Sequence, residues 1–349
     1  MDRPESHRWS RLITQATRTF AVGMVVYCLL TGSGCVWLRH QQGRELDICR
    51  ECIENSFRAQ QVGDLRKARA YLADGASQQP RHAEIWWNLA ELSIQQDDYA
   101  SAIRELTKYI ELQPNDPQGH LRLAQLYYLQ AQYKLAEEAL QPTIRLTPNN
   151  FEAILLSARL ARKQAGYQQA TAAYYHALQV NPGHVEATLE LSELLISRME
   201  ANRAAGLLRE LSRRNLEAED ISRVHLNLGI AYGQTNRWEN AVEQLILARS
   251  LAPSQDNRDR YRLAYAHWKA GDIQQSLELL IEIADAGQWN QRSEALYTQL
   301  TQDSLAGEFN PTLQVVNYHT LAPFLPDRLL SSDSVNPQDL IPPEWAMTE

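Results

Sequence analysis

The sequence predicts an all-α fold made of repeated pairs of helices, and three observations carry this prediction. The stretch from Ala83 to His184 divides into three consecutive units of 34 residues, with no insertion between them. A small residue recurs at the eighth and twentieth positions of each unit. A proline recurs at the thirty-second position, where it ends the second helix because it has no backbone N–H and clashes with the preceding turn.

The same register extends to both sides and gives seven expected units. Their twentieth positions hold only small residues, namely Ala68, Ala102, Ala136, Ala170, Ala204, Ala241 and Ser276. Small residues there let two helices approach closely, while larger apolar residues at the seventh, seventeenth and twenty-fourth positions fill the space around them. The fifth unit departs from the pattern, since Leu216 stands where proline is expected and residues 219–221 are extra.

This spacing resembles the tetratricopeptide repeat, a helix-turn-helix unit of 34 residues. Armadillo and HEAT units are longer, at about 40 residues or more, and do not fit the observed step. The resemblance implies a right-handed superhelical solenoid of about seven units, in which each unit contacts its neighbours. A terminal helix is expected to cover the open end of the array.

The predicted organisation follows from this register and from the composition of the two ends. A basic segment (1–19), an apolar segment (20–38) and a linker (39–48) precede the array (49–290), and a capping helix (291–307) and a proline-rich irregular tail (308–349) follow it. The units are expected at 49–82, 83–116, 117–150, 151–184, 185–221, 222–255 and 257–290. The tail either stays irregular or folds back onto the solenoid through its leucines.

The apolar segment 20–38 has no charged residue and follows four arginines, Arg3, Arg8, Arg11 and Arg18. As a helix rising about 1.5 Å per residue it would cross about 28 Å, enough for a bilayer core, so a single-pass anchor is favoured. The second interpretation is a lipoprotein, because the residues before Cys35 resemble a bacterial lipobox that is lipidated at this cysteine, although Gly32 departs from it. A cytoplasmic protein is the third. The first two place the array outside the cytoplasm, in the cell envelope.

Composition and motifs argue against several functional classes. The net charge is −8, with 34 basic and 42 acidic residues and no long run of one sign, which disfavours nucleic-acid binding. The chain has no phosphate-binding glycine loop, nucleophile elbow or paired metal-binding histidines. Cys49 and Cys52 have redox-motif spacing, but no strand-helix pattern or further ligands accompany them, so packing is expected. We therefore expect no enzyme, cofactor, metal or small-molecule substrate.

The resemblance implies that the first helix of each unit lines a concave groove for a protein or peptide. The expected partner-binding residues are Trp87, Asn88, Glu91, Arg122, Tyr128, Arg159, Arg162, Arg223, Asn227, Arg258, Arg262 and Trp268. Along the groove, apolar-aromatic, basic, acidic and basic zones would alternate. Three alternatives stay open: a solvated polar face without a ligand, self-association into an envelope assembly, and a role as accessory subunit of a larger complex.

Some tetratricopeptide domains hold the terminal carboxylate of a peptide with a clamp of Lys, Asn, Asn, Lys and Arg. Here Asn227, Arg258 and Arg262 fall on the last three clamp positions, whereas Leu189 and Glu193 occupy the first two. A glutamate opposes an anion at this place. The sequence therefore favours a looser acidic or extended peptide near the arginines over a true clamp.

Overall fold

The computed structural model describes residues 48–252 and 257–306. The basic segment, the apolar segment 20–38 with Cys35, the linker up to residue 47 and the tail lie outside the described residues, so the expectations for them stay predictions. Among the helices that the structure does describe, none combines the length and the apolar character that crossing a bilayer requires.

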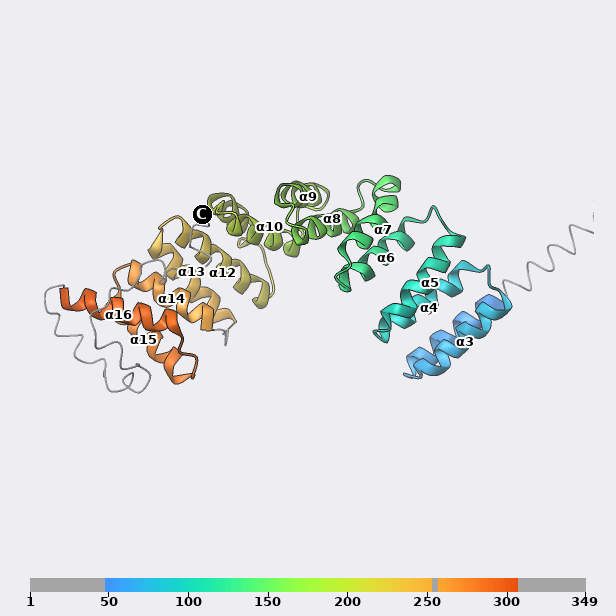
Figure 1. Ribbon diagram of the computed structural model, residues 1–349, viewed down its shortest axis with the longest axis horizontal. Helices are drawn as coiled ribbons and strands as arrows, with labels where there is room; N and C mark the ends of the chain where they lie inside the picture. The colour runs from blue at the N-terminus through green and yellow to red at the C-terminus, as the bar shows by residue number, and fades with distance from the viewer. Residues whose placement is uncertain (1–47, 253–256, 307–349) are drawn as a thin grey trace, which may run out of the picture. The chain divides into compact units, whose positions relative to one another are not determined.

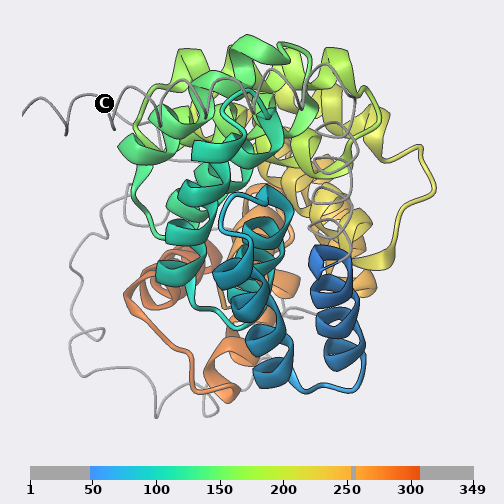
Figure 2. The same ribbon diagram turned by 90° about the vertical axis from the view of Figure 1, so that its right-hand side faces the viewer.

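The secondary structure of the described residues is helical throughout, without strands, as predicted. Figure 1 shows the helices packed side by side in consecutive pairs, and Figure 2 shows the same pairs from the side. The chain divides into two compact units, Met1–Pro148 and Asn149–Glu349, and each is considered by itself. The handedness predicted for the solenoid stays a prediction.

In the first compact unit each expected repeat contains two helices. The first repeat has a helix at residues 48–61 and α3 at Leu65–Gln78. The next two have α4 at Ala83–Gln95 with α5 at Tyr99–Leu112, and α6 at Pro117–Leu129 with α7 at Tyr133–Leu146.

The second compact unit continues the same pattern. Its helices are α8 Phe151–Lys163, α9 Tyr167–Val180, α10 Val185–Ser197, α11 Ala201–Leu211, α12 Ala218–Gln234, α13 Trp238–Leu251, α14 Asn257–Lys269, α15 Ile273–Asp285 and α16 Gln291–Ala306. The extra residues 219–221 do not form a loop but join the first turns of α12, where Glu219 and Asp220 suit the positive end of the helix dipole.

The packing of each helix pair depends on the small residues that define the register. All seven residues at the twentieth position are 0% exposed. At the eighth position of the sixth repeat, a Cβ added to Gly229 would lie 2.7 Å from Leu245 Cγ, so α12 and α13 are already in close contact. At the end of the array, Leu296, Tyr297 and Leu300 of α16 are buried, and α16 contacts α14 and α15.

The turn inside each repeat has one recurring backbone feature. The fifteenth residue adopts a positive φ in every expected repeat, at Gly63, Asp97, Ala131, Ala165, Met199, Asn236 and Gly271. This left-handed conformation reverses the chain between the two helices. It is strained for residues that have a Cβ.

Candidate partner-binding face

The arginines that were expected to line the groove form ion pairs with carboxylates of neighbouring repeats. In the first compact unit, Arg122 of α6 donates from Nε and Nη2 to the two carboxylate oxygens of Glu91 on α4, both at 2.7 Å. Such a bidentate pair fixes both side chains. Two residues predicted to bind a partner therefore contact each other across the face of the first helices.

The second compact unit has the same kind of contact in series. Arg159 of α8 pairs with Glu190 of α10 at 2.7 Å, and Arg162 pairs with Glu193 at 3.4 Å. Figure 1 shows α8 and α10 close together within this unit. Glu190 also accepts a hydrogen bond from Tyr174 at 2.9 Å, and burial raises the pKa of this phenol, which therefore stays protonated and donates.

Arg223 of α12 extends this series toward the C-terminus. It donates to Glu186 at 2.8 Å and to Glu193 at 3.5 Å. The Arg223 guanidinium holds the pKa of Glu186 below its usual value, because it stabilises the charged carboxylate. The sequence predicted separate basic and acidic zones along the groove. In the structure these basic and acidic residues pair with one another between the first helices of neighbouring repeats.

The other predicted residues are placed as follows. Asn88 donates to the backbone oxygen of Glu84 at 2.7 Å. The Tyr128 ring lies 5.7 Å from Tyr133, and Trp268 lies edge-on to Tyr265 with Lys269 over its ring at 3.9 Å. The Arg258 residue is exposed.

The positions of the carboxylate clamp are mostly out of reach of a partner. Leu189 is fully buried, and Asn227 and Arg262 are each only 8% exposed. Arg262 donates to Asp259 at 2.5 Å, and Glu193 is held by two arginines. A peptide carboxylate could not reach this set without movement of α12 and α14.

One cleft in the first compact unit opens between α4, α5 and the start of α6. Its volume is about 400 Å³. We call it the aromatic cleft, and its polar and aromatic lining consists of Glu84, Trp87, Tyr109, Gln113, Asp116 and Gln118. The Trp87 and Tyr109 rings lie 5.2 Å apart, centroid to centroid, with an angle of 59° between their planes.

Hydrogen bonds and packing hold the aromatic cleft in shape. Tyr109 donates to Asp116 Oδ2 at 2.5 Å, and Asp116 also accepts from the backbone N–H groups of Gln118 and Gly119. Burial, together with the bond to Asp116, raises the pKa of Tyr109 to about 12, so the phenol is neutral at ordinary pH. Gly119 lies directly against the ring, because an added Cβ would be 2.7 Å from Tyr109 Cε1.

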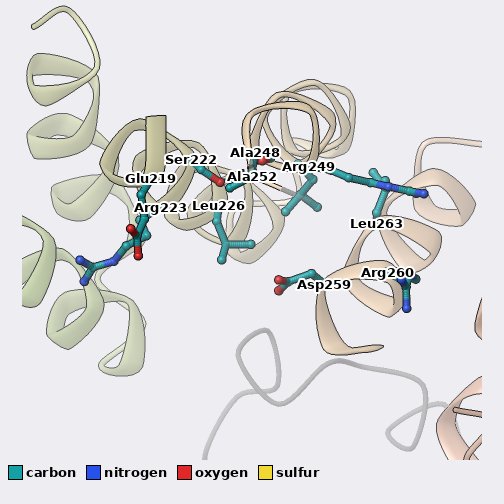
Figure 3. Close-up of a pocket in the computed structure, with 11 residues that line it drawn as sticks. Glu219, Ser222, Arg223, Leu226, Ala248, Arg249, Ala252, Asp259, Arg260 and Leu263 are labelled. Atoms are coloured by element: carbon teal, nitrogen blue, oxygen red, sulfur yellow. Dashed lines mark hydrogen bonds between the residues drawn. The ribbon is translucent and has the colours of Figure 1, made fainter. Parts of the chain in front are cut away.

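A second cleft, of about 350 Å³, lies in the second compact unit between α12, α13 and α14. We call it the arginine-rimmed cleft. Its apolar lining is Leu226, Leu245, Ala248, Ala252 and Leu263, and its polar lining is Glu219, Ser222, Arg223, Arg249, Asp259 and Arg260. In Figure 3 the Leu226 side chain and the Asp259 carboxylate point toward the same space, whereas the Arg223 guanidinium points away. Arg249 is paired with Glu282 at 2.6 Å, and Arg260 donates to Gln288 at 3.1 Å.

Cys49 and Cys52 are buried thiols on the first described helix. Burial, with the nearby charges of Asp74 and Glu51, raises the pKa of Cys52, which disfavours the reactive thiolate. Residues 48–252 and 257–306 contain no group of three or more His, Cys, Asp or Glu side chains arranged to hold a metal ion.

Comparison with known proteins decides the kind of repeat. Residues 59–120 and 93–160 match the family model for the tetratricopeptide repeat. A tetratricopeptide repeat protein from Parabacteroides merdae is 16% identical, with 73% of this chain and 99% of that chain covered and a TM-score of 0.52. The described helices have the tetratricopeptide repeat fold. No curated protein sequence matches the chain.

Two further solved structures are similar over a smaller share of the chain. MamA from Desulfovibrio magneticus RS-1 is 20% identical, with 48% of this chain and 96% of that chain covered and a TM-score of 0.45. YrrB, described as a tetratricopeptide repeat protein with an unusual peptide-binding site, is 16% identical, with 56% and 97% covered and a TM-score of 0.48.

Numbered by tetratricopeptide position, the two clefts lie at the same place in the second and the sixth repeat. Both are lined by the residues at positions 1, 2, 5, 27 and 31 of the repeat. These pairs are Ala83 and Ser222, Glu84 and Arg223, Trp87 and Leu226, Tyr109 and Ala248, and Gln113 and Ala252. The repeat therefore provides one kind of cleft with two different linings.

Proposed function

We propose that this chain is a non-catalytic scaffold that binds a protein or peptide partner on the face formed by its first helices. The observation that carries the proposal is the recurrence of a cleft at one repeat position with two different linings. Clefts of this size accept a side chain of a partner, with polar groups at the rim to orient it. Packed helices hold both clefts open, so binding needs little ordering of the scaffold.

The paired charges support recognition by shape rather than by free charge alone. Arg122, Arg159 and Arg223 already have carboxylate partners within the scaffold. An acidic peptide would have to displace those carboxylates and leave them unpaired, which costs free energy. The partner is therefore not expected to bind these arginines through acidic side chains, and its contacts are expected at the two clefts instead.

Photo-crosslinking tests this proposal. A photoreactive amino acid is introduced in the full chain at Trp87 or Leu226, which line the clefts, and at Glu138, which is exposed on the second helix α7. We expect a specific crosslinked partner from the two cleft positions and not from Glu138. Equal labelling at all three positions, or none at the clefts, would contradict the proposal.

We place the scaffold in the cell envelope, attached to a membrane through residues 20–38. The support is the uncharged segment that follows four arginines. Metabolic labelling with a fatty-acid probe separates the two forms of attachment. Label in the natural chain that is lost in Cys35→Ala identifies a lipoprotein, whereas membrane association without label in either chain identifies a spanning anchor.

A second candidate function is self-association, and one feature favours it. Ile246, Leu247 and Leu251 of α13 are 47%, 38% and 39% exposed and lie on one side of this helix. Exposed apolar patches often mark association surfaces. Light scattering over a range of concentrations is the test: a mass that rises with concentration and returns to the monomer value in Leu247→Lys supports self-association, and a constant monomer mass excludes it.

A further inference from the structure

The aromatic cleft has a charge and ring chemistry that identifies the kind of group it accepts. Its lining contains the carboxylates of Glu84 and Asp116, the rings of Trp87 and Tyr109, and no Lys or Arg. Neither Glu84 nor Asp116 forms an ion pair with a Lys or Arg among the residues that the structure describes. The cleft therefore has a net charge of about −2 that the surrounding scaffold does not neutralise.

The surroundings moderate this charge only in part. Glu84 lies in the first turn of α4, and Asp116 is the N-cap of α6. A helix N-terminus carries the equivalent of about half a positive charge, which stabilises each carboxylate without cancelling it. Arg122 of α6 is not part of the lining and is already paired with Glu91 at 2.7 Å.

The two aromatic rings also favour a positively charged group. The faces of Trp and Tyr attract cations placed within about 6 Å of the ring centre, and tryptophan does so most strongly. Trp87 is partly exposed, and Tyr109 is fixed by Asp116 on one side and Gly119 on the other. The side chain of arginine or lysine has the apolar stem and the charged end that such a lining accommodates.

We propose that the aromatic cleft binds an arginine or lysine side chain of the partner peptide. The cation lies against the Trp87 and Tyr109 rings on one side and faces the carboxylates of Glu84 and Asp116 on the other. This inference rests on the proposed function, because it names the chemistry of the partner at one of the two clefts. The arginine-rimmed cleft in the sixth repeat lacks the aromatic pair and has three arginines at its edge, so it does not share this preference.

The test measures binding of capped, fluorescently labelled nonapeptides with one central arginine to the full chain by fluorescence anisotropy. Matched peptides carry lysine, glutamine or glutamate at the centre. We expect the arginine and lysine peptides to bind at least about 5-fold more tightly than the glutamine peptide, and the glutamate peptide to bind most weakly, with the preference reduced by added salt.

Variants connect this preference to the cleft. Glu84→Gln removes an exposed carboxylate without disturbing the core. It is expected to weaken binding of the arginine peptide about 3- to 5-fold and to leave binding of the glutamine peptide unchanged. Trp87→Phe should retain part of the preference and Trp87→Leu should lose it. Glu111→Gln is the matched control, since Glu111 is exposed on α5 outside the cleft and pairs with Lys108. Circular dichroism checks that each variant is folded.

The outcomes separate this inference from the proposed function. Equal binding of the arginine and glutamine peptides overturns the cation preference, and the proposed function stands if the crosslinker at Trp87 still captures a partner. An arginine preference that is insensitive to Glu84 and Trp87 also overturns the inference. Tetramethylammonium is a further probe: if it binds in a Trp87-dependent manner and the arginine peptide does not, the cleft accepts a small quaternary cation and the peptide proposal is wrong.

Discussion

At the scale of single residues, Glu105 holds together helices from two repeats. It is the one buried acidic residue in the described part of the chain, at 8% exposed. Its two oxygens accept from Arg69 of α3 and from Ser93 of α4, each at 2.6 Å, and Arg69 also donates to Ser93 at 2.6 Å. Both partners, Arg69 and Ser93, donate to the carboxylate, so the network is sensitive to its charge.

Replacing Glu105 with glutamine should therefore destabilise the array. The amide keeps one hydrogen bond but leaves the Arg69 charge without its carboxylate. Because the Arg69 side chain is 35% exposed and stays partly hydrated, we expect a loss of about 2 kcal/mol rather than the larger cost of a fully buried pair. Urea denaturation measures it. Glu111→Gln on the exposed face should change stability by less than about 0.5 kcal/mol, and a similar loss in both variants would contradict the account.

His267 gives the array a dependence on pH. Burial lowers its pKa, and the nearby charges of Asp272 and Glu278 oppose this shift without cancelling it. The unfolded chain, in which histidine has a pKa of about 6.5, then binds a proton that the folded chain does not. The stability that the neutral imidazole contributes is therefore fully present above the unfolded pKa of about 6.5. It is lost as the pH falls through the lower pKa of the folded chain.

The comparison between the natural chain and His267→Gln isolates this effect. Between pH 7 and pH 5 the natural chain should lose more stability than the variant, measured by urea denaturation at each pH. Equal losses would show that His267 titrates alike in the folded and unfolded chains.

At the scale of the helix pair, the sequence predicted the contacts but not the turn. The alanines and Ser276 at the twentieth position were recognisable because close helix contact requires small side chains. The positive φ at the fifteenth position was not, because Asp97, Ala131, Met199 and Asn236 share no side-chain chemistry. The start of α12 at Ala218 was also not predicted. Residues 219–221 are extra to the 34-residue register, which therefore does not assign them to a helix, although nothing in them prevents the helix from including them.

This turn predicts opposite effects of the same substitution at two sites of the fourth repeat. Ala165→Gly should stabilise the chain by up to about 1 kcal/mol, because Ala165 has a φ of 59° and glycine adopts that conformation without strain. Ala172→Gly in the exposed part of α9 should destabilise it by about 1 kcal/mol. Thermal unfolding of both variants is the measurement, and a loss in both would show that the turn is not strained.

At the scale of the whole molecule, adjoining helices within each compact unit provide the main contacts, as expected when every repeat rests on its neighbours. Ion pairs reinforce this stacking across the first helices. Glu91 with Arg122 and Arg159 with Glu190 each join the ninth position of one repeat to the sixth position of the next. That complementarity is present in the sequence, but it is informative only once adjacent first helices are known to lie side by side. The candidate face was predictable from the repeat, whereas the clefts depend on side-chain packing.

The central claim is that a partner binds along the first helices, and amide hydrogen exchange tests it most directly. The partner captured at Trp87 is purified, and exchange of the full chain is compared with and without it. We expect slower exchange in α4, in the C-terminal end of α5 that lines the aromatic cleft and in the start of α6, with α7 changed little. Slower exchange confined to α5, α7 or α13, with α4 and α6 unchanged, would contradict the claim.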